Sequence, residues 1–308
     1  MSEPVQNAYT IFIILCIGFT LRQCGVLDRE SVRRFTFVIM YITLPCAILS
    51  SAQGLVFDAA LLFVVPISFV FNLVLLYLPY WRHDPSRWRM FCMYTLAGFN
   101  VGNFMLPFMQ SMLTPRAFLA LALFDLVNAL FIFGGSYSAA LWCNRQVMPG
   151  EAVSPGAILK ELSKSFPTYA YLIAIGFSIY HVSIPDFVMH PVMTIGRANT
   201  FVCMLIIGTA LSVKMPKGDL RELLHILLMR YSVGIVLAAA VWFLLPLARD
   251  IRIILVLLAL APMASINSVT TLRKMPEHAG ISADLVSVSL LISLVVVTVM
   301  TTLLPFGE

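Results

Sequence analysis

The chain has 308 residues, of which 60% are hydrophobic and 11% are charged, and its mean hydropathy is +0.93. Soluble domains carry about 25% charged residues, so this composition excludes a soluble enzyme, a nucleic-acid-binding domain and a disordered protein. The net charge of +5 matters less than the positions of the charges, because lysine and arginine orient a membrane protein. One membrane-spanning helix needs about 20 apolar residues, so the length allows about ten spans.

Apolar runs bounded by charge, proline or glycine predict ten membrane-spanning helices. In chain order these are residues 5–21, 35–51, 59–78, 90–113, 117–143, 166–182, 191–213, 220–247, 251–272 and 281–304. Asp58 is placed to cap the third helix, and Thr114 with Pro115 forms a capping residue and first-turn proline for the fifth. The expected fold class is therefore an all-α polytopic membrane protein.

The twenty lysine and arginine residues are divided unevenly between the two sides of these spans. The connections after odd-numbered spans hold fifteen of them, the even-numbered connections and both tails hold three, and two lie inside spans. Basic loops stay in the cytoplasm. The distribution therefore predicts a multi-pass protein of the cell (inner) membrane with both termini on the non-cytoplasmic side.

The longest connection, residues 144–165, divides the chain into residues 1–143 and residues 166–308, with five predicted spans in each part. Residues 17–21 read Ile-Gly-Phe-Thr-Leu, and residues 175–179 read Ile-Gly-Phe-Ser-Ile. A repeat with an odd number of spans enters the membrane from the opposite side in its second copy. This pattern predicts the inverted repeat that many secondary transporters contain.

The fourth span of each half carries proline and polar residues near its middle. These residues are Asn100, Gly102, Asn103 and Pro107 in the fourth span, and Pro262, Ser265 and Asn267 in the ninth. Proline removes a backbone donor and glycine leaves helical geometry easily, so both spans are expected to break and to cross near the midplane. The restarted helices would point their positive ends at one site, which favours an anion such as a carboxylate. We predict that these seven residues bind a small organic anion.

Three charged residues lie more than one helical turn inside predicted spans. Asp125 lies about 15 Å from Pro115 along the fifth helix and shares a helix face with Asn128. Two interpretations stay open for it: it carries a coupling proton, or it has a structural role, for example as a partner of Arg197. Arg197 either binds the substrate carboxylate or extends to the outer surface, and Arg230 is expected to extend to the cytoplasmic surface.

Other polar residues give weaker signals. Asn72 either lines the cavity or makes an interhelical hydrogen bond. The five histidines lie in loops or at span ends, and the six cysteines form no CxxC pair. We therefore expect no metal site, no cofactor and no enzymatic activity.

The chain resembles the auxin efflux carrier family, which comprises the PIN-type plant transporters and their shorter bacterial relatives. Residues 44–49, Leu-Pro-Cys-Ala-Ile-Leu, are similar to the family's LPALIL-like second span. Asn100-x-Gly102 followed by Pro107 is similar to its NtGxxGxP segment, and residues 261–267, which contain Pro262 and Asn267, are similar to its proline-to-asparagine segment. The pattern departs at Met105, where the family has a second glycine, and at Asn103, where it has an apolar residue.

The resemblance implies an elevator-type exchanger of organic anions. Spans 1, 2, 6 and 7 would form a scaffold that dimerises, and spans 3–5 and 8–10 would carry the site through the lipid bilayer. Family substrates are auxin in plants and small carboxylates such as malonate or malate in bacteria. The alternatives are a sodium-coupled symporter of the bile-acid type, which shares the architecture, and a receptor or sensor with a transporter fold.

Overall fold

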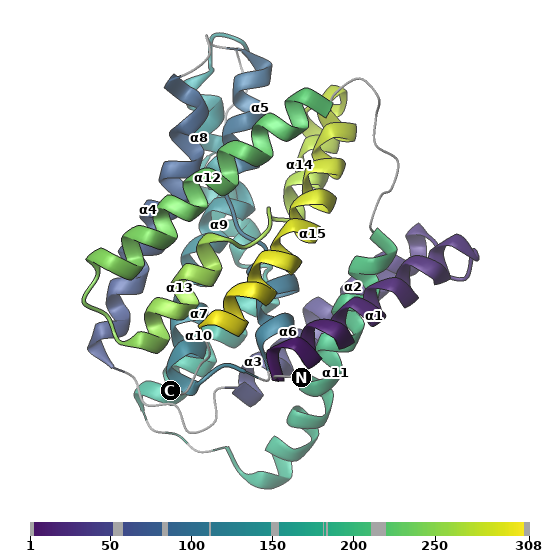
Figure 1. The fold of residues 1–308 in the computed structure, drawn as a ribbon, viewed down its shortest axis with the longest axis vertical. Coiled ribbons are helices and arrows are strands. Elements are labelled where there is room, and N and C mark those ends of the chain that lie inside the picture. Colours follow the sequence, from purple (N-terminus) through teal and green to yellow (C-terminus); the bar gives the residue numbers. More distant parts are fainter. Residues whose placement is uncertain are drawn as a thin grey trace.

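A computed structural model of the chain describes residues 3–51, 58–81, 86–110, 112–148, 154–180, 182, 184–210 and 220–304. The regular elements of these residues are helices, with one isolated β-bridge between Phe99 and Met263 (Figure 1). The predicted all-helical class is thus confirmed for the described part of the chain.

The described residues of the first half form eight α-helices, which are joined in places by short π or 3-10 segments, written η. They are α1 (Glu3–Gln23), α2 (Arg29–Val38), η1 (Ile39–Thr43), α3 (Leu44–Ser51), η2 (Ala59–Phe63), α4 (Val64–Tyr77), η3 (Leu78–Trp81), α5 (Arg87–Leu96), η4 (Val101–Met105), α6 (Leu106–Met109), α7 (Pro115–Leu130), η5 (Phe131–Gly135) and α8 (Ser136–Cys143). Both predicted caps are present, because Asp58 accepts from the Ala60 amide and Thr114 from the Ala117 amide. The bond from Ala60 holds the pKa of Asp58 below its ordinary value.

The second half follows a short helix in the central connection. The helix of the connection is α9 (Pro155–Leu162). The elements of the second half are α10 (Phe166–Ile179), α11 (Asp186–Ala210), α12 (Leu220–Leu244), α13 (Arg249–Ala259), α14 (Ile266–Lys274), η6 (Pro276–His278) and α15 (Ala279–Leu303). The predicted start of the seventh span at Pro191 is wrong, since α11 begins at Asp186 and contains that proline. Pro191 is the sixth residue of α11, so it removes the bond that an amide there would make to the Phe187 carbonyl, and the helix continues past it at that cost. The predicted end of this span, residues 211–213, lies outside the described residues.

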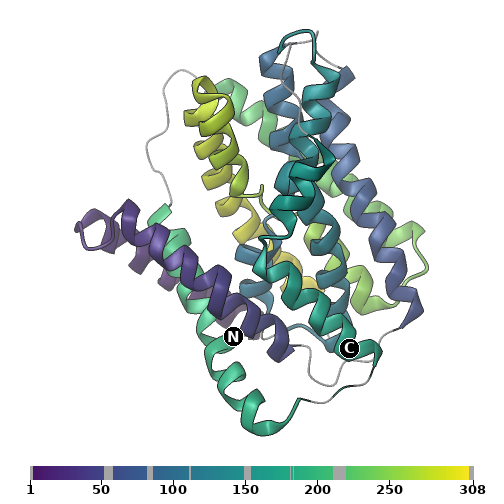
Figure 2. The ribbon, with the colours of Figure 1, turned by 180° about the vertical axis from the view of Figure 1, so that it is seen from behind.

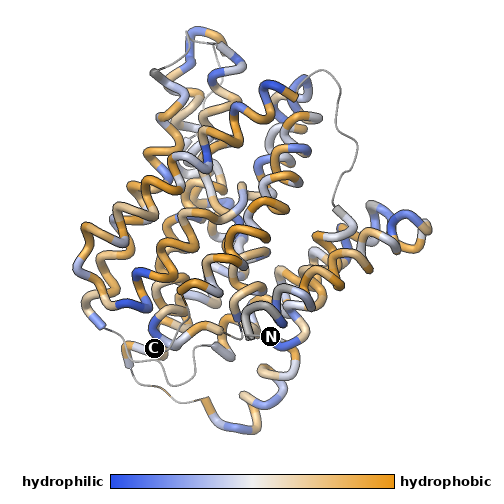
Figure 3. The backbone as a smooth tube through the Cα atoms, viewed as in Figure 1, coloured by the Kyte–Doolittle hydropathy of each residue, from blue (hydrophilic) through white to orange (hydrophobic). Residues whose placement is uncertain are grey.

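Within the described residues, six helical stretches are long and apolar enough to cross a membrane. They are Glu30–Ser51, Ala59–Tyr80, Pro115–Cys143, Asp186–Thr209, Leu220–Leu244 and Pro276–Leu303. Hydrophobic residues predominate along these stretches (Figure 3), and large apolar side chains on them, such as Phe37, Phe69 and Val236, are exposed. Two further apolar helices, Tyr9–Gln23 and Phe166–Ile179, are shorter. The chain is a polytopic membrane protein.

Helices α1 and α11 lie side by side at one edge of the molecule in both views (Figures 1 and 2). Their backbones approach through two glycines: a Cβ atom on Gly18 would lie 2.1 Å from the Leu205 carbonyl oxygen, and one on Gly208 would lie 2.3 Å from that of Leu15. Any larger residue would separate the two helices. This is the small-residue packing typical of helices in membranes.

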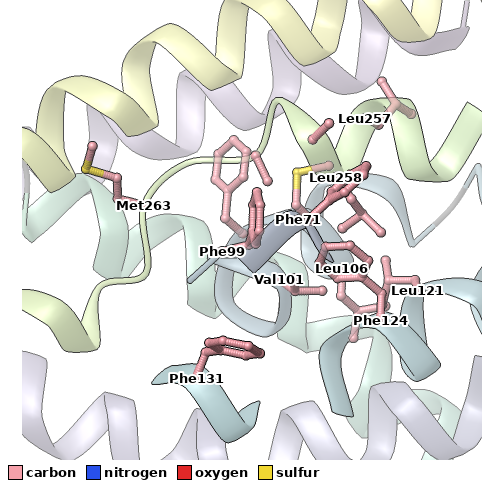
Figure 4. Packing of buried hydrophobic residues seen from close by; sticks show 14 of the residues in the cluster. Phe71, Phe99, Val101, Leu106, Leu121, Phe124, Phe131, Leu257, Leu258 and Met263 are labelled. Atoms are coloured by element: carbon pink, nitrogen blue, oxygen red, sulfur yellow. The ribbon is translucent and has the colours of Figure 1, made fainter. Parts of the chain in front are cut away.

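A buried hydrophobic cluster extends through the helices, and aromatic rings gather in one part of it. Phe71 of α4 and Phe124 of α7 meet edge to face at 5.8 Å between ring centroids, and Phe99 packs against Phe124 at 5.4 Å (Figure 4). Phe99 belongs to a stretch between helices, so this aromatic cluster holds a non-helical stretch in the buried interior.

Candidate functional site

Besides a kink at Phe133 and Gly134 within η5, two helical segments of the described chain are interrupted by longer non-helical stretches, and these two interruptions touch each other. Between α5 and η4, residues 97–100 leave the helix, and between α13 and α14, residues 260–265 do the same. The Asn100 amide donates to the Pro262 carbonyl at 2.9 Å, and Phe99 and Met263 form the antiparallel bridge (Figure 4). The predicted interruptions of the fourth and ninth spans are confirmed, and they lie side by side.

The residue that breaks the first segment is not the one predicted. Gly98 has φ +88°, a left-handed conformation that glycine adopts without the cost of a Cβ atom. Gly102 lies inside η4, and Pro107 is the second residue of α6. Pro107 is tolerated there because it follows the π segment at the start of α6. Pro262 does lie in the second non-helical stretch, as predicted.

Asn267, in the second interrupted segment, provides hydrogen bonds to the backbone carbonyls at the end of α5 in the first. Its side-chain amide donates to the carbonyls of Thr95 and Ala97, both at 3.1 Å, at the C-terminal end of α5. The side chain is 2% exposed and does not line the cavity described below. The structure therefore places Asn267 behind the crossing point, where it holds the two segments together.

Arg230 of α12 is buried at the crossing point, so the expectation that it extends to the surface is wrong. Its side chain is 1% exposed, and its guanidinium donates to the carbonyls of Leu96, Ala261 and Pro262. It also lies over the Phe99 ring, 4.7 Å from the centroid. The carbonyl ends of two helices carry partial negative charge. Arg230 is therefore stabilised as a buried cation at these carbonyls and does not extend to the membrane surface.

Backbone donors and acceptors of the two non-helical stretches are satisfied by polar side chains of neighbouring helices. Asn72 accepts from Gly98 at 3.1 Å, and Asn128 accepts from Phe99 at 2.9 Å. Asn72 is fully buried, so of its two interpretations the interhelical hydrogen bond is the one observed. This polar frame explains how unwound backbone is accommodated inside a membrane protein.

Ser289 and Ser293 of α15 form hydrogen bonds with the backbone of the second non-helical stretch, residues 260–265. Ser289 accepts from Met263 at 3.2 Å, and Ser293 donates to the Leu260 carbonyl at 2.8 Å. Sequence analysis missed both serines and the role of Arg230. Their only signal was polarity within an apolar run, which in a membrane protein indicates a specific partner.

A cavity of about 110 Å³ opens beside the crossing point. Five of the predicted site residues line it, namely Asn100, Gly102, Asn103, Asp125 and Ser265. Pro107, Asn128, Pro262, Asn267 and Arg197 do not. Tyr171 of α10 lines the cavity as well and was not predicted; its buried hydroxyl lies near the Asp125 carboxyl.

Hydrogen-bond donors dominate the wall formed by the restarted helices. Within the described part of the chain, the backbone amides of residues 101–104 and 264–266 have no acceptor. The Asn100 side-chain amide donates to the Ser265 hydroxyl at 2.8 Å, and the Asn103 side chain, also on this wall, forms no hydrogen bond with any described residue. Free amides at a helix start are a typical binding site for an anion.

Asp125 is the one acidic residue among those lining the cavity. Its carboxylate accepts from Asn128 at 3.0 Å, and a Cβ atom on Gly102 would lie 3.6 Å from its other oxygen. Among the described residues no cation pairs with it, and Arg197 lines a different cavity, so the predicted pairing of these two residues is not observed. Asp125 instead faces the positive end of the restarted helix.

Among the described residues, no group of three or more histidine, cysteine, aspartate or glutamate side chains is arranged to hold a metal ion. Comparisons of the sequence with known protein families and with curated proteins find no match. The resemblance to the auxin efflux carriers therefore depends on the motifs quoted above.

Proposed function

We propose that this protein is a secondary transporter that moves a small organic anion, a carboxylate, through the crossing point of the two interrupted segments. One observation carries the proposal: the carbonyl ends of both interruptions are occupied by protein donors, whereas the amide ends are open to a cavity. A wall with open backbone amides and covered backbone carbonyls attracts negative ligands.

The proposed architecture has ten spans in two inverted halves, residues 1–143 and 166–308. Six long helices, two shorter apolar helices and two interrupted segments account for ten crossings, which supports this count. The starts of α5 and α12, which border basic connections, lie toward one end of the molecule, and the start of α1 lies toward the other (Figure 1). This arrangement supports an orientation in the inner membrane with both termini non-cytoplasmic.

Family resemblance suggests how the site moves. In this proposal α1, α2 with α3, α10 and α11 form the scaffold and the dimer contact. The remaining spans carry the cavity across the bilayer in an elevator motion. The scaffold side of the cavity is supplied by residues such as Leu44 and Tyr171, so movement of the two interrupted segments past these residues would expose the site alternately to each side.

Asp125 is proposed to couple the anion to a proton. A carboxylate substrate and an ionised Asp125 in one small cavity repel each other, so the anion binds best when Asp125 is protonated. Proton and anion binding then favour each other by the same factor, as linkage requires. Uptake should therefore rise as the pH falls on the side from which the substrate enters.

The proposal is tested with purified protein in liposomes. Malonate, malate and indole-3-acetate are screened first by thermal shift and then by counterflow, with and without sodium and pH gradients. We expect a pH-dependent exchange of at least one carboxylate, which Asn103→Ala reduces at least about tenfold. The control Gln23→Ala removes an exposed amide far from the cavity and should leave exchange unchanged.

Three results would contradict this proposal. Equal exchange by Asn103→Ala and Gln23→Ala would remove the cavity from the transport path. Strong stimulation by sodium alone would favour a symporter of the bile-acid type. Thermal stabilisation by a carboxylate without any counterflow would favour a receptor.

A further inference from the structure

A second cavity, of about 490 Å³, lies between α1, α3, α6 and α11. The continuous helical segment of η4 and α6 separates it from the crossing-point cavity. Gly102 and Asn103 of this segment line the first cavity, and Pro107 and Phe108 line the second. The two walls are about 6–9 Å apart along the helix.

The second cavity contains one cation, Arg197, and no acidic residue among those that line it. Arg197 follows the first residue of α11 by eleven positions, about 16 Å along the helix, which places it near the middle of α11. Its side chain is exposed, and no described residue forms an ion pair or hydrogen bond with it. An uncompensated guanidinium in a cavity with low-dielectric walls raises the local concentration of anions.

The position of Arg197 is set by close packing on both sides. A Cβ atom on the preceding residue, Gly196, would lie 2.9 Å from Ser50 Oγ, so α11 lies directly on α3. Thr200, one turn later, donates to the Pro107 carbonyl at 3.0 Å and fixes α11 against α6. The guanidinium is thereby held on the cavity wall, where its planar donors suit a carboxylate.

We infer that this cavity is a vestibule on the non-cytoplasmic side in which Arg197 binds the carboxylate before it reaches the crossing point. The inference rests on the proposed function for the identity of the ligand. The cavity adjoins Thr10 near the start of α1 and Ser51 at the end of α3, which the charge distribution places on the non-cytoplasmic side.

The electrostatic part is tested without any substrate. A Ser51→Cys variant places a thiol in the cavity, and two membrane-impermeant methanethiosulfonates, one with a sulfonate and one with a trimethylammonium group, are added from the non-cytoplasmic side of oriented vesicles. Labelling of the parent protein, which keeps its six cysteines, is subtracted. We expect the anionic-to-cationic rate ratio to exceed that of a small thiol in solution by about fivefold or more.

Arg197→Gln in the Ser51→Cys background should bring this ratio to within about twofold of the solution value. The control Arg249→Gln removes an equal charge from another exposed position on the same predicted side and should leave the ratio high. Thr10→Cys provides a second reporter on a different lining helix, α1. An unchanged ratio in Arg197→Gln, or labelling only from the cytoplasmic side, overturns the inference.

Substrate protection then separates this inference from the proposed function. Malonate should slow labelling of Ser51→Cys, and Arg197→Gln should raise the concentration for half protection about tenfold. If malonate is exchanged but protection does not depend on Arg197, the vestibule is wrong and the transporter stands. If the rate ratios behave as expected but no carboxylate protects or is exchanged, the anion cavity is present and the proposed function fails.

Discussion

Two pairs of segments bring their backbones into close contact in this molecule, and they do so by opposite means. Helices α1 and α11 are uninterrupted at their contact and approach through Gly18 and Gly208. The two interrupted segments approach through unwound backbone, and their polar groups are satisfied by Arg230 and Asn267. The first contact depends on the absence of side chains, whereas the second depends on long polar ones.

This difference teaches where function can be placed in a membrane-spanning fold. A contact between intact helices leaves no backbone group free to bind a ligand, because every amide is used within its helix. A contact between interrupted helices leaves amides open, provided that the carbonyl ends are covered. Disruption of the contact between α1 and α11 should therefore lower stability alone, whereas disruption of the crossing point should also abolish exchange.

The largest effect is expected for Arg230→Met. The change leaves the carbonyls of Leu96 and Ala261 buried without donors, at a cost of about 1–3 kcal/mol each. We expect a lower unfolding temperature and complete loss of exchange. The control Arg221→Met removes an exposed arginine from the same helix and should change neither. If Arg230→Met unfolds at the temperature of the parent, the guanidinium does not hold the crossing point.

A smaller, purely structural effect is expected for Gly208→Ala. Its Cβ atom would meet the Leu15 carbonyl oxygen at 2.3 Å, so α1 and α11 must move apart at a cost of about 1–3 kcal/mol. Stability should fall while the thermal shift caused by a bound carboxylate persists, because the cavity is unchanged. Gly176→Ala, where a Cβ atom would contact nothing within 4 Å, is the matched control. Loss of the ligand-induced shift in Gly208→Ala would show that the two contacts are not independent.

Sequence analysis predicted this division only in part. Proline, glycine and asparagine stand out in apolar runs, so the interruptions near Asn100 and Pro262 could be predicted within a few residues. The partners could not, because they depend on how each helix is rotated about its axis. Asn267 turns toward Thr95, which lies far away in the chain, and Arg230 points inward and not toward the surface. Neither direction follows from position within an apolar run.

Asp125→Asn tests the cavity at the open amide ends of the two interrupted segments. The amide keeps the size of the side chain and the contact with Asn128 but cannot exchange a proton. Carboxylate exchange, which should rise as the pH falls in the parent, should become independent of pH, and the difference is expected to be about tenfold across the range in which Asp125 titrates. The measurement is counterflow at several pH values. An Asp125→Asn protein with the full pH dependence of the parent would show that another group carries the proton.

The smallest effect is expected for Pro107→Ala. Because Gly98 and not Pro107 breaks the first segment, alanine should extend α6 without closing the interruption, and its carbonyl can still accept from Thr200. Exchange should stay within about twofold of the parent, since alanine suits a helix and the cavity wall at Gly102 is unchanged. Gly98→Ala is the informative comparison: its φ of +88° and the Ile132 Cγ2 atom 2.7 Å from a Cβ atom there predict a cost of about 1–2 kcal/mol and a large loss of exchange. The reverse order of the two variants would mean that the proline, as its position in the apolar run first indicated, determines where the helix breaks.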